Sequence, residues 1–185
     1  PALADVEPAQ KIALARELEK AALAQDPRIQ RVDGCSVMTE ASECVIRNSR
    51  GLNLISHTNV ALAYVAPVAE EDGRVNVGMK FQMEQEFDAL DAQGIAKAAV
   101  EKALSGLAAE QPASRTCAIA FQNLAAASLL GVFASIFSAE AAQKGLSLLK
   151  GREGEAIASA AVTIVDDPHR PHSVASKPFD GEGVP

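Results

Sequence analysis

The uncharged segment at residues 124–137 constrains the fold more than any other part of the sequence. It reads LAAASLLGVFASIF and carries no charge, although 22% of the chain's residues are charged. A bilayer span needs about 20 apolar residues, and Gln122, Asn123 and Ser128 interrupt a window of that length. Neither end has the Lys/Arg or Trp/Tyr residues that anchor a spanning helix. Because a helix that is apolar on every side belongs in a core, the segment predicts a buried helix and no membrane contact.

The first 110 residues have the pattern of an antiparallel sheet covered by helices. Residues 8–24 repeat apolar side chains at helical spacing, with Pro8 in the first turn and Asp26-Pro27 after the end. Residues 28–87 are rich in Val and Ile alternating with polar residues, which predicts strands, and polar breaks at 40–42, 48–51 and 70–73 predict turns between them. Asp91 is a suitable cap for a second helix over 93–107. The pattern predicts an α+β domain over residues 1–110.

A second domain is predicted over residues 112–185, after the polar break EQPASR at 110–115. A strand is expected at 116–121 (TCAIAF), followed by the buried helix and by strands at 147–149 and 161–165. Glycines at 145, 151 and 154 mark turns. This order predicts a second α+β domain that starts with a strand, a buried helix and further strands.

Charge and cysteine content exclude some functions. The net charge of −7, without a basic cluster, argues against direct nucleic-acid binding. Cys35, Cys44 and Cys117 are odd in number and form no CxxC pair, so free thiols and a cytoplasmic location are expected.

No catalytic constellation is visible in the residues themselves. His169 and His172, with Asp166 and Asp167 before them, carry atoms that bind zinc. Two prolines in that loop prevent the helical spacing of an HExxH site, so a solvated loop is favoured over a metal site. Surface or packing roles are favoured for the remaining candidates, which are His57, Cys35, Cys44, Ser128, Ser135 and the GREGE turn at 151–155. For the two serines, hydrogen bonds to the helix backbone are favoured.

The order of four motifs along the chain points to a known family. CVIRNSRG at 44–51 gives a strand followed by a turn that contains Asn48, Ser49 and Gly51. SLLKGREGEAIAS at 147–159, DDPH at 166–169 and PFDGEGVP at 178–185 follow. This succession resembles the TldD/PmbA family, the TldD/TldE peptidase once named a modulator of DNA gyrase, over essentially the whole chain. The resemblance implies a longer protein of which this is an internal segment.

The resemblance implies that the uncharged helix has lost, or never had, a metal site. TldD-like members carry HExxxH on this helix, where two histidines bind zinc and the glutamate activates water. Gly131, Val132 and Ile136 occupy those three positions here, and none can bind a metal or move a proton. No catalytic or metal-binding residue is therefore carried over, and the chain resembles the PmbA/TldE type. Zinc is expected in the sister subunit and not in this chain.

Two functions follow as expectations. The first is a non-catalytic subunit of a cytosolic TldD/TldE-type metallopeptidase that degrades or processes flexible peptides. Its partner would be an HExxxH-bearing sister or a second copy. The alternative is a structural protein of the same fold that binds peptides or a partner without protease work. Phe179, Asp180, Glu182 and Gly183 are candidates for a groove or subunit contact, although a purely conformational turn is favoured.

Overall fold

The computed structural model describes residues 2–185, and backbone contacts divide them into two units. The larger unit contains residues 2–111 together with 166–185, and the smaller contains 112–165. The chain is mixed α and β, with an antiparallel sheet in the larger unit, as the sequence predicts. In the described residues, no helix is long and apolar enough to cross a membrane.

Two helices of the larger unit begin and end close to their predicted positions. α1 spans Pro8–Ala24 and α2 spans Ala92–Leu107, while the short 3-10 helices η1 and η2 span Ala2–Asp5 and Phe87–Ala89. Asp91 caps α2 because its Oδ1 accepts a hydrogen bond from the Gly94 backbone N–H at 2.9 Å. At the start of α1, the Glu7 backbone N–H donates to Gln10 Oε1 at 2.9 Å. Both predicted helices are confirmed.

The sheet is built around one long central strand. β1 (Ile29–Arg47) pairs antiparallel with β2 (Asn53–Glu71), and β2 pairs antiparallel with both β3 (Arg74–Val77) and β4 (Lys80–Glu84). The predicted turn at 40–42 is wrong, because Glu40 pairs with Val60 and Ser42 with Thr58 inside the continuous β1–β2 ladder. These polar residues lie where neither face of the ribbon is buried, so they do not break the strand.

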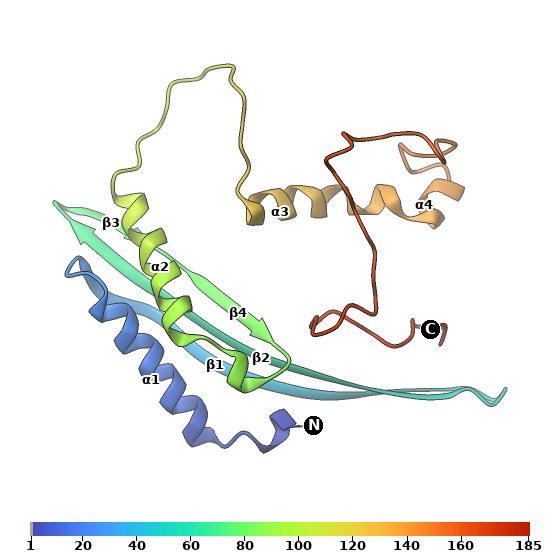
Figure 1. The fold of residues 1–185 in the computed structure, drawn as a ribbon, viewed down its shortest axis with the longest axis horizontal. Helices are drawn as coiled ribbons and strands as arrows, with labels where there is room; N and C mark the ends of the chain where they lie inside the picture. The colour runs from blue at the N-terminus through green and yellow to red at the C-terminus, as the bar shows by residue number, and fades with distance from the viewer. Residues whose placement is uncertain (1) are drawn as a thin grey trace. The chain divides into compact units, whose positions relative to one another are not determined.

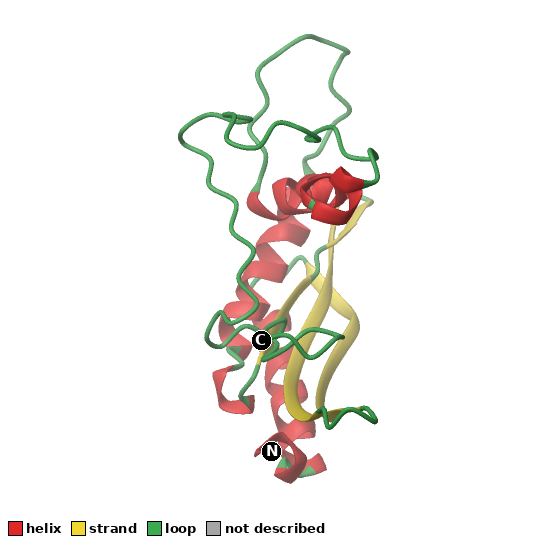
Figure 2. Ribbon diagram, turned by 90° about the vertical axis from the view of Figure 1, so that its right-hand side faces the viewer, coloured by secondary structure: helices red, strands yellow, loops and turns green. Residues whose placement is uncertain are grey.

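The core lies between one face of the sheet and the two helices (Figures 1 and 2). Most of its side chains are small, so the layers approach closely. Gly78, between β3 and β4, marks the closest approach: a Cβ there would lie 2.1 Å from the Ala99 carbonyl oxygen of α2. The buried residues of α2 and β2 are Ala92, Ile95, Ala96, Ala99, Val100, Ala103 and Leu107, and Ala61, Ala63, Val65, Pro67, Val68 and Ala69.

Side chains from β3 complete the last turn of α2. The Asn76 Nδ2 donates to the Ala103 carbonyl at 2.7 Å, and the Arg74 Nη1 donates to the Leu107 carbonyl at 3.2 Å. Helix C-termini leave carbonyls without intrahelical partners. The strand therefore supplies a donor to the Leu107 carbonyl, which has no i+4 partner within the helix, and a further donor to the Ala103 carbonyl one turn earlier.

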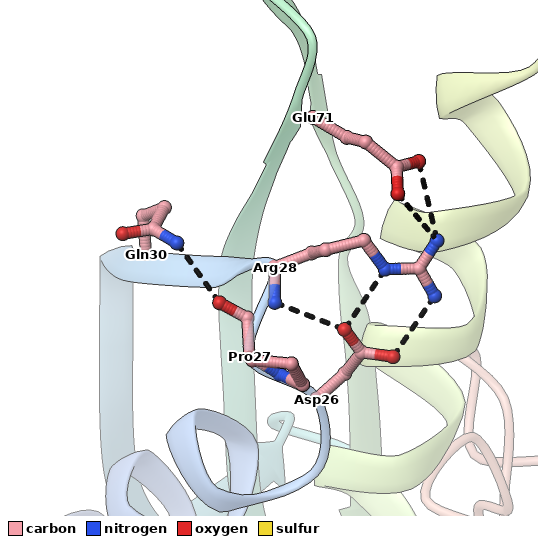
Figure 3. A network of polar contacts seen from close by, with 5 residues as sticks. All are labelled: Asp26, Pro27, Arg28, Gln30 and Glu71. Atoms are coloured by element: carbon pink, nitrogen blue, oxygen red, sulfur yellow. Dashed lines mark hydrogen bonds and ion pairs between the residues drawn. The ribbon is translucent and has the colours of Figure 1, made fainter.

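An ion-pair network ties the connection between α1 and β1 to the end of β2 (Figure 3). The Arg28 Nη2 lies 2.9 Å from Asp26 Oδ2, and its Nη1 lies 3.3 Å from Glu71 Oε2. Asp26 Oδ1 also accepts from the Arg28 backbone N–H at 2.9 Å. The hydrogen bonds from Arg28, those of the side chain foremost, lower the pKa of Asp26 to about 2.

Half of the β1–β2 ribbon projects past the helices (Figure 1). The last polar contact from α1 along β1 is the hydrogen bond from Lys11 Nζ to Thr39 Oγ1, at 2.7 Å. From residue 40 through the turn to residue 60, no residue is buried. We call residues 40–60 the hairpin arm.

The smaller unit differs from its prediction. It contains α3 (Asn123–Phe133), the 3-10 helix η3 (Ala134–Phe137) and α4 (Ala139–Gln143). Residues 116–121, 147–149 and 161–165, predicted as strands, form none, and α3 has no buried residue. Strands need hydrogen-bonding neighbours and an apolar helix needs a second layer, and the described residues of this unit supply neither. The predicted strand–buried helix–strand arrangement is therefore wrong for residues 112–165.

Candidate functional site

The three residues that the resemblance places at the HExxxH positions lie at the junction of α3 and η3. Gly131 and Val132 lie in the last turn of α3, and Ile136 lies on η3. A side chain at Gly131 would enter open space, and Val132 is 73% exposed. Gly131 and Val132 are therefore open to solvent and Ile136 is half-buried, and none of the three side chains contains a nitrogen, oxygen or sulfur atom.

Ile136 contributes to a pocket of about 310 Å³ within the smaller unit. Its apolar lining includes Phe137, Leu149 and Ile157, and the GREGE turn supplies charged groups. In that turn the Arg152 Nε donates to Glu155 Oε2 at 2.8 Å. Ser147 links η3 to the segment that follows α4, because its Oγ donates to the Ile136 carbonyl and accepts from the Leu149 backbone N–H at 3.0 Å. The pocket can hold an apolar side chain beside carboxylates, but it contains no nucleophile and base in contact.

Zinc does not fit the side chains at the three motif positions. Zinc sites in proteins use thiolate, imidazole or carboxylate ligands, which Gly131, Val132 and Ile136 lack. Across residues 2–185, no group of three or more His, Cys, Asp or Glu side chains is close enough to hold a metal ion. The His169 backbone N–H donates to Asp167 Oδ1 at 3.0 Å, which makes a local turn.

The other candidate side chains make ordinary local contacts. Ser128 Oγ donates to the Leu124 carbonyl at 2.9 Å, the helix-backbone bond that the sequence predicts. The Cys35 thiol donates to the Ala15 carbonyl at 3.3 Å, and burial raises its pKa. Cys44 is exposed, and His57 lies 3.7 Å from Glu43 across the hairpin arm. None of these contacts joins a nucleophile to a base.

Two turns singled out by the sequence lie together in the larger unit. At the tip of the hairpin arm, Asn48 Oδ1 accepts from the backbone N–H groups of Arg50 and Leu52, at 2.9 and 3.1 Å, and Gly51 has φ +93°. Gly183 of the PFDGEGVP turn approaches the same tip: a Cβ on it would lie 2.9 Å from Leu54 and 3.1 Å from Leu52. Ser49 is exposed beside them.

The PFDGEGVP turn is held by its own aspartate. Asp180 Oδ1 accepts from the backbone N–H groups of Glu182 and Val184, at 2.8 and 2.9 Å, and Gly183 has φ +87°. The two hydrogen bonds, the one from Val184 foremost, lower the pKa of Asp180. Phe179 and Asp180 line a pocket of about 350 Å³ with His169 and Lys177. The carboxylate thus has a conformational role, while Phe179 faces a space that a ligand can enter.

Sequence reasoning missed the contact between the two turns and the pocket beside Ile136. The contact joins residues far apart in the chain, and no local pattern signals it. For the pocket, the glycines at 151 and 154 gave a usable signal, because both have positive φ and bend the GREGE segment back.

Comparisons with known proteins find family and sequence matches along nearly the whole chain. Residues 1–107 match the PmbA/TldA metallopeptidase central domain, and residues 114–185 match the PmbA/TldA metallopeptidase C-terminal domain. Two curated relatives cover 98% of this chain: the metalloprotease PmbA homolog of Haemophilus influenzae, 28% identical, and metalloprotease PmbA of Escherichia coli O157:H7, 27% identical. The chain spans 40% of the length of each relative.

Solved structures share the fold. A Thermotoga maritima protein named as a modulator of a DNA gyrase is 28% identical over 98% of this chain and 42% of its own, with a TM-score of 0.82. TldE from Thermococcus kodakarensis covers 100% of this chain and 42% of its own, at 24% identity and a TM-score of 0.79. With two family domains matched in order along its length, the chain belongs to the PmbA/TldD metallopeptidase family.

Proposed function

We propose that this chain is a zinc-free, PmbA/TldE-like subunit of a TldD/TldE-type metallopeptidase that processes flexible peptides in the cytosol. The observation that carries the proposal is the side-chain chemistry of Gly131, Val132 and Ile136, which offers no metal ligand and no general base. The catalytic zinc would belong to a sister subunit with an HExxxH motif. This chain would contribute binding surface to a chamber that the two share.

Several features of the larger unit support a role in assembly. The hairpin arm and the PFDGEGVP turn meet at the half-buried residues Leu52, Leu54 and Gly183. Asp180 and Glu182 of the turn are exposed beside this contact, so Phe179, Asp180, Glu182 and Gly183 are proposed as part of a peptide groove or subunit contact. Three free thiols are compatible with a reducing compartment. The division into a central domain (1–110) and the beginning of a C-terminal domain (112–185) is proposed on the polar break at 110–115.

Peptide cleavage in a reconstituted mixture tests the proposal. An unstructured fluorescent peptide is incubated with zinc and with three samples: the protein at its full natural length, the HExxxH sister, and the two together. We expect no cleavage by the first sample and faster cleavage by the mixture than by the sister alone. The matched control is a sister whose HExxxH glutamate is replaced by glutamine, which should be inactive in the mixture.

Zinc binding provides a second readout that does not depend on activity. After equilibrium dialysis against zinc, metal analysis should find no stoichiometric zinc in the protein alone and zinc in the sister. Cleavage by this protein alone would contradict the proposal. A sister whose rate is unchanged by the protein would favour the alternative, a peptide- or partner-binding structural protein.

A further inference from the structure

All three methionines of the chain have exposed side chains. Met38, Met79 and Met83 are 53%, 49% and 42% exposed, whereas methionine is among the residue types most often buried. Met38 of β1 and Met83 of β4 pair with the same residue of the central strand, Leu62, from its two sides. Two exposed thioethers therefore share one row of the sheet.

This row belongs to an apolar surface on the face of the sheet that the helices leave open. Ala61 and Ala63 of β2 are buried in the core with α1 and α2, which lie on one side of the sheet (Figure 2). Because side chains alternate along a strand, Leu62 and Tyr64 lie on the opposite face. Tyr64 pairs with Phe81, which is 42% exposed. We define the open sheet face as Met38, Leu62, Tyr64, Phe81 and Met83.

One end of the open sheet face is acidic. Glu40 follows Met38 by two residues on β1, so it lies on the same face, and it is exposed. At this end β4 runs into EQEFDALD at 84–91, which contains four acids and no base. Glu86 and Asp88 are exposed, and neither they nor Glu40 forms an ion pair with another described residue. These carboxylates are complementary to positive charge on a ligand.

Methionine is suited to a surface whose ligand varies in sequence. Its side chain is unbranched, rotates about three bonds and carries a polarisable sulfur, and it is common at surfaces that bind many partners. The rings of Tyr64 and Phe81 add broad apolar area beside the two thioethers. A folded partner presents one fixed shape, whereas unfolded peptides present many. The composition of this surface therefore favours an unfolded peptide as its ligand.

We propose that the open sheet face binds unfolded peptide segments in which apolar side chains lie next to Lys or Arg. The apolar side chains would contact Met38, Phe81 and Met83, while the basic ones would reach Glu40 and the acids of 84–91. The inference rests on the proposed function, since it takes flexible peptides as the substrate. It deepens that function by placing a binding surface on this chain and by naming the sequences that the surface prefers.

Peptide binding without cleavage tests the inference. Fluorescence anisotropy follows the titration of a labelled peptide of Leu and Lys, interrupted by Pro, with the protein at its full natural length. Neither the sister nor zinc is present. A second peptide has Glu in place of Lys, and a third has Ser in place of Leu. The Leu/Lys peptide should bind with a Kd about tenfold or more below that of either comparison peptide.

Charged substitutions locate the binding surface. Met38→Lys combined with Met83→Lys should raise the Kd of the Leu/Lys peptide about tenfold or more, because it removes apolar contact and repels the peptide's lysines. The matched control combines Ile12→Lys with Leu23→Lys, two positions of α1 that are 53% and 42% exposed. The control should bind like the wild type. Circular dichroism shows whether each variant is folded.

Reversing the acidic end should change which peptide is preferred. Glu40→Lys combined with Glu86→Lys should weaken binding of the Leu/Lys peptide and strengthen binding of the Leu/Glu peptide. A folding defect would weaken binding of both peptides. Opposite changes for the two peptides therefore report on charge recognition alone.

Oxidation singles out the thioethers. Hydrogen peroxide transfers one oxygen atom to each methionine sulfur, which gives a polar sulfoxide and water. Treated protein should bind the Leu/Lys peptide about tenfold more weakly, and methionine sulfoxide reductases A and B with dithiothreitol should restore binding. A variant with Met38→Leu, Met79→Leu and Met83→Leu keeps the surface apolar and retains the cysteines. Peroxide should leave its binding unchanged.

Four results would overturn the inference. They are equal binding of the three peptides, an unchanged Kd in the variant with two methionines replaced by lysine, an unchanged preference in the variant with two glutamates replaced by lysine, and wild-type binding that peroxide does not weaken. Because neither the sister nor zinc enters these measurements, such a failure would leave the proposed function to be judged by the cleavage assay.

Discussion

Replacing Gly78 with alanine should disrupt the contact between α2 and the sheet. The new Cβ would lie 2.1 Å from the Ala99 carbonyl oxygen and 2.4 Å from the Ala103 backbone nitrogen. Both are main-chain atoms of a helix, so no side chain can rotate away, and the connection between β3 and β4 must move away from α2. Overpacking of this kind costs typically about 1–3 kcal/mol, and the rigidity of both neighbours puts Gly78→Ala at about 3 kcal/mol.

Urea denaturation followed by circular dichroism measures this cost. At about 2–4 °C per kcal/mol for a chain of 150–250 residues, the same change should lower the Tm by about 6–12 °C. The matched control is Gly181→Ala, in the same unit, where an added Cβ meets nothing within 4 Å. The control should stay within about 0.5 kcal/mol of the wild type. A Gly78→Ala protein as stable as the control would refute the close approach of the β3–β4 connection to α2.

Three further predictions concern polar contacts. Asn76→Ala removes the donor to the Ala103 carbonyl and should lower the free energy of unfolding by about 1–2 kcal/mol, seen as a lower urea midpoint at constant slope. Because Arg28 lowers the pKa of Asp26 from 3.8 to about 2, this pair stabilises the fold above about pH 4 and the benefit disappears as pH falls to about 2. The stability difference between wild type and Asp26→Asn, measured by urea titration at several pH values, should shrink across that range, and a constant difference would contradict the assignment. Asp180→Ala should speed hydrogen exchange of the Glu182 and Val184 amides, whereas Asp180→Asn, which keeps an acceptor oxygen, should do so less.

Local signals predicted the larger unit well and the smaller unit poorly. The helices over 8–24 and 93–107 depend on apolar spacing, on Pro8 and on the Asp91 cap, all readable within one segment. The false turn at 40–42 arose because polar residues in a ribbon exposed on both faces look like a turn. Strands at 116–121, 147–149 and 161–165 were expected from composition, but a strand forms only where a neighbour completes its hydrogen bonds.

The side-chain chemistry of the candidate site could be predicted from the sequence, whereas the contacts within it could not. The placement of Gly131, Val132 and Ile136 at the motif positions comes from the order of motifs along the sequence and needs no structure. The approach of Gly183 to Leu52 and Leu54 depends on the path of the chain between them, which no segment encodes alone.

The long pairing of β1 with β2 also bears on how the protein folds. Bringing Arg47 to Asn53 closes only the short turn, whereas joining Ile29 to Ala69 closes the whole hairpin. Loop-closure entropy grows with loop length, so pairing costs least at the turn, where nothing is buried to hold it. The apolar gain comes only at the far end, where Ala63 and Val65 meet the helices. Zippering from the turn is therefore reversible until α1 and α2 dock, which makes helix docking the step that commits the chain to its native state.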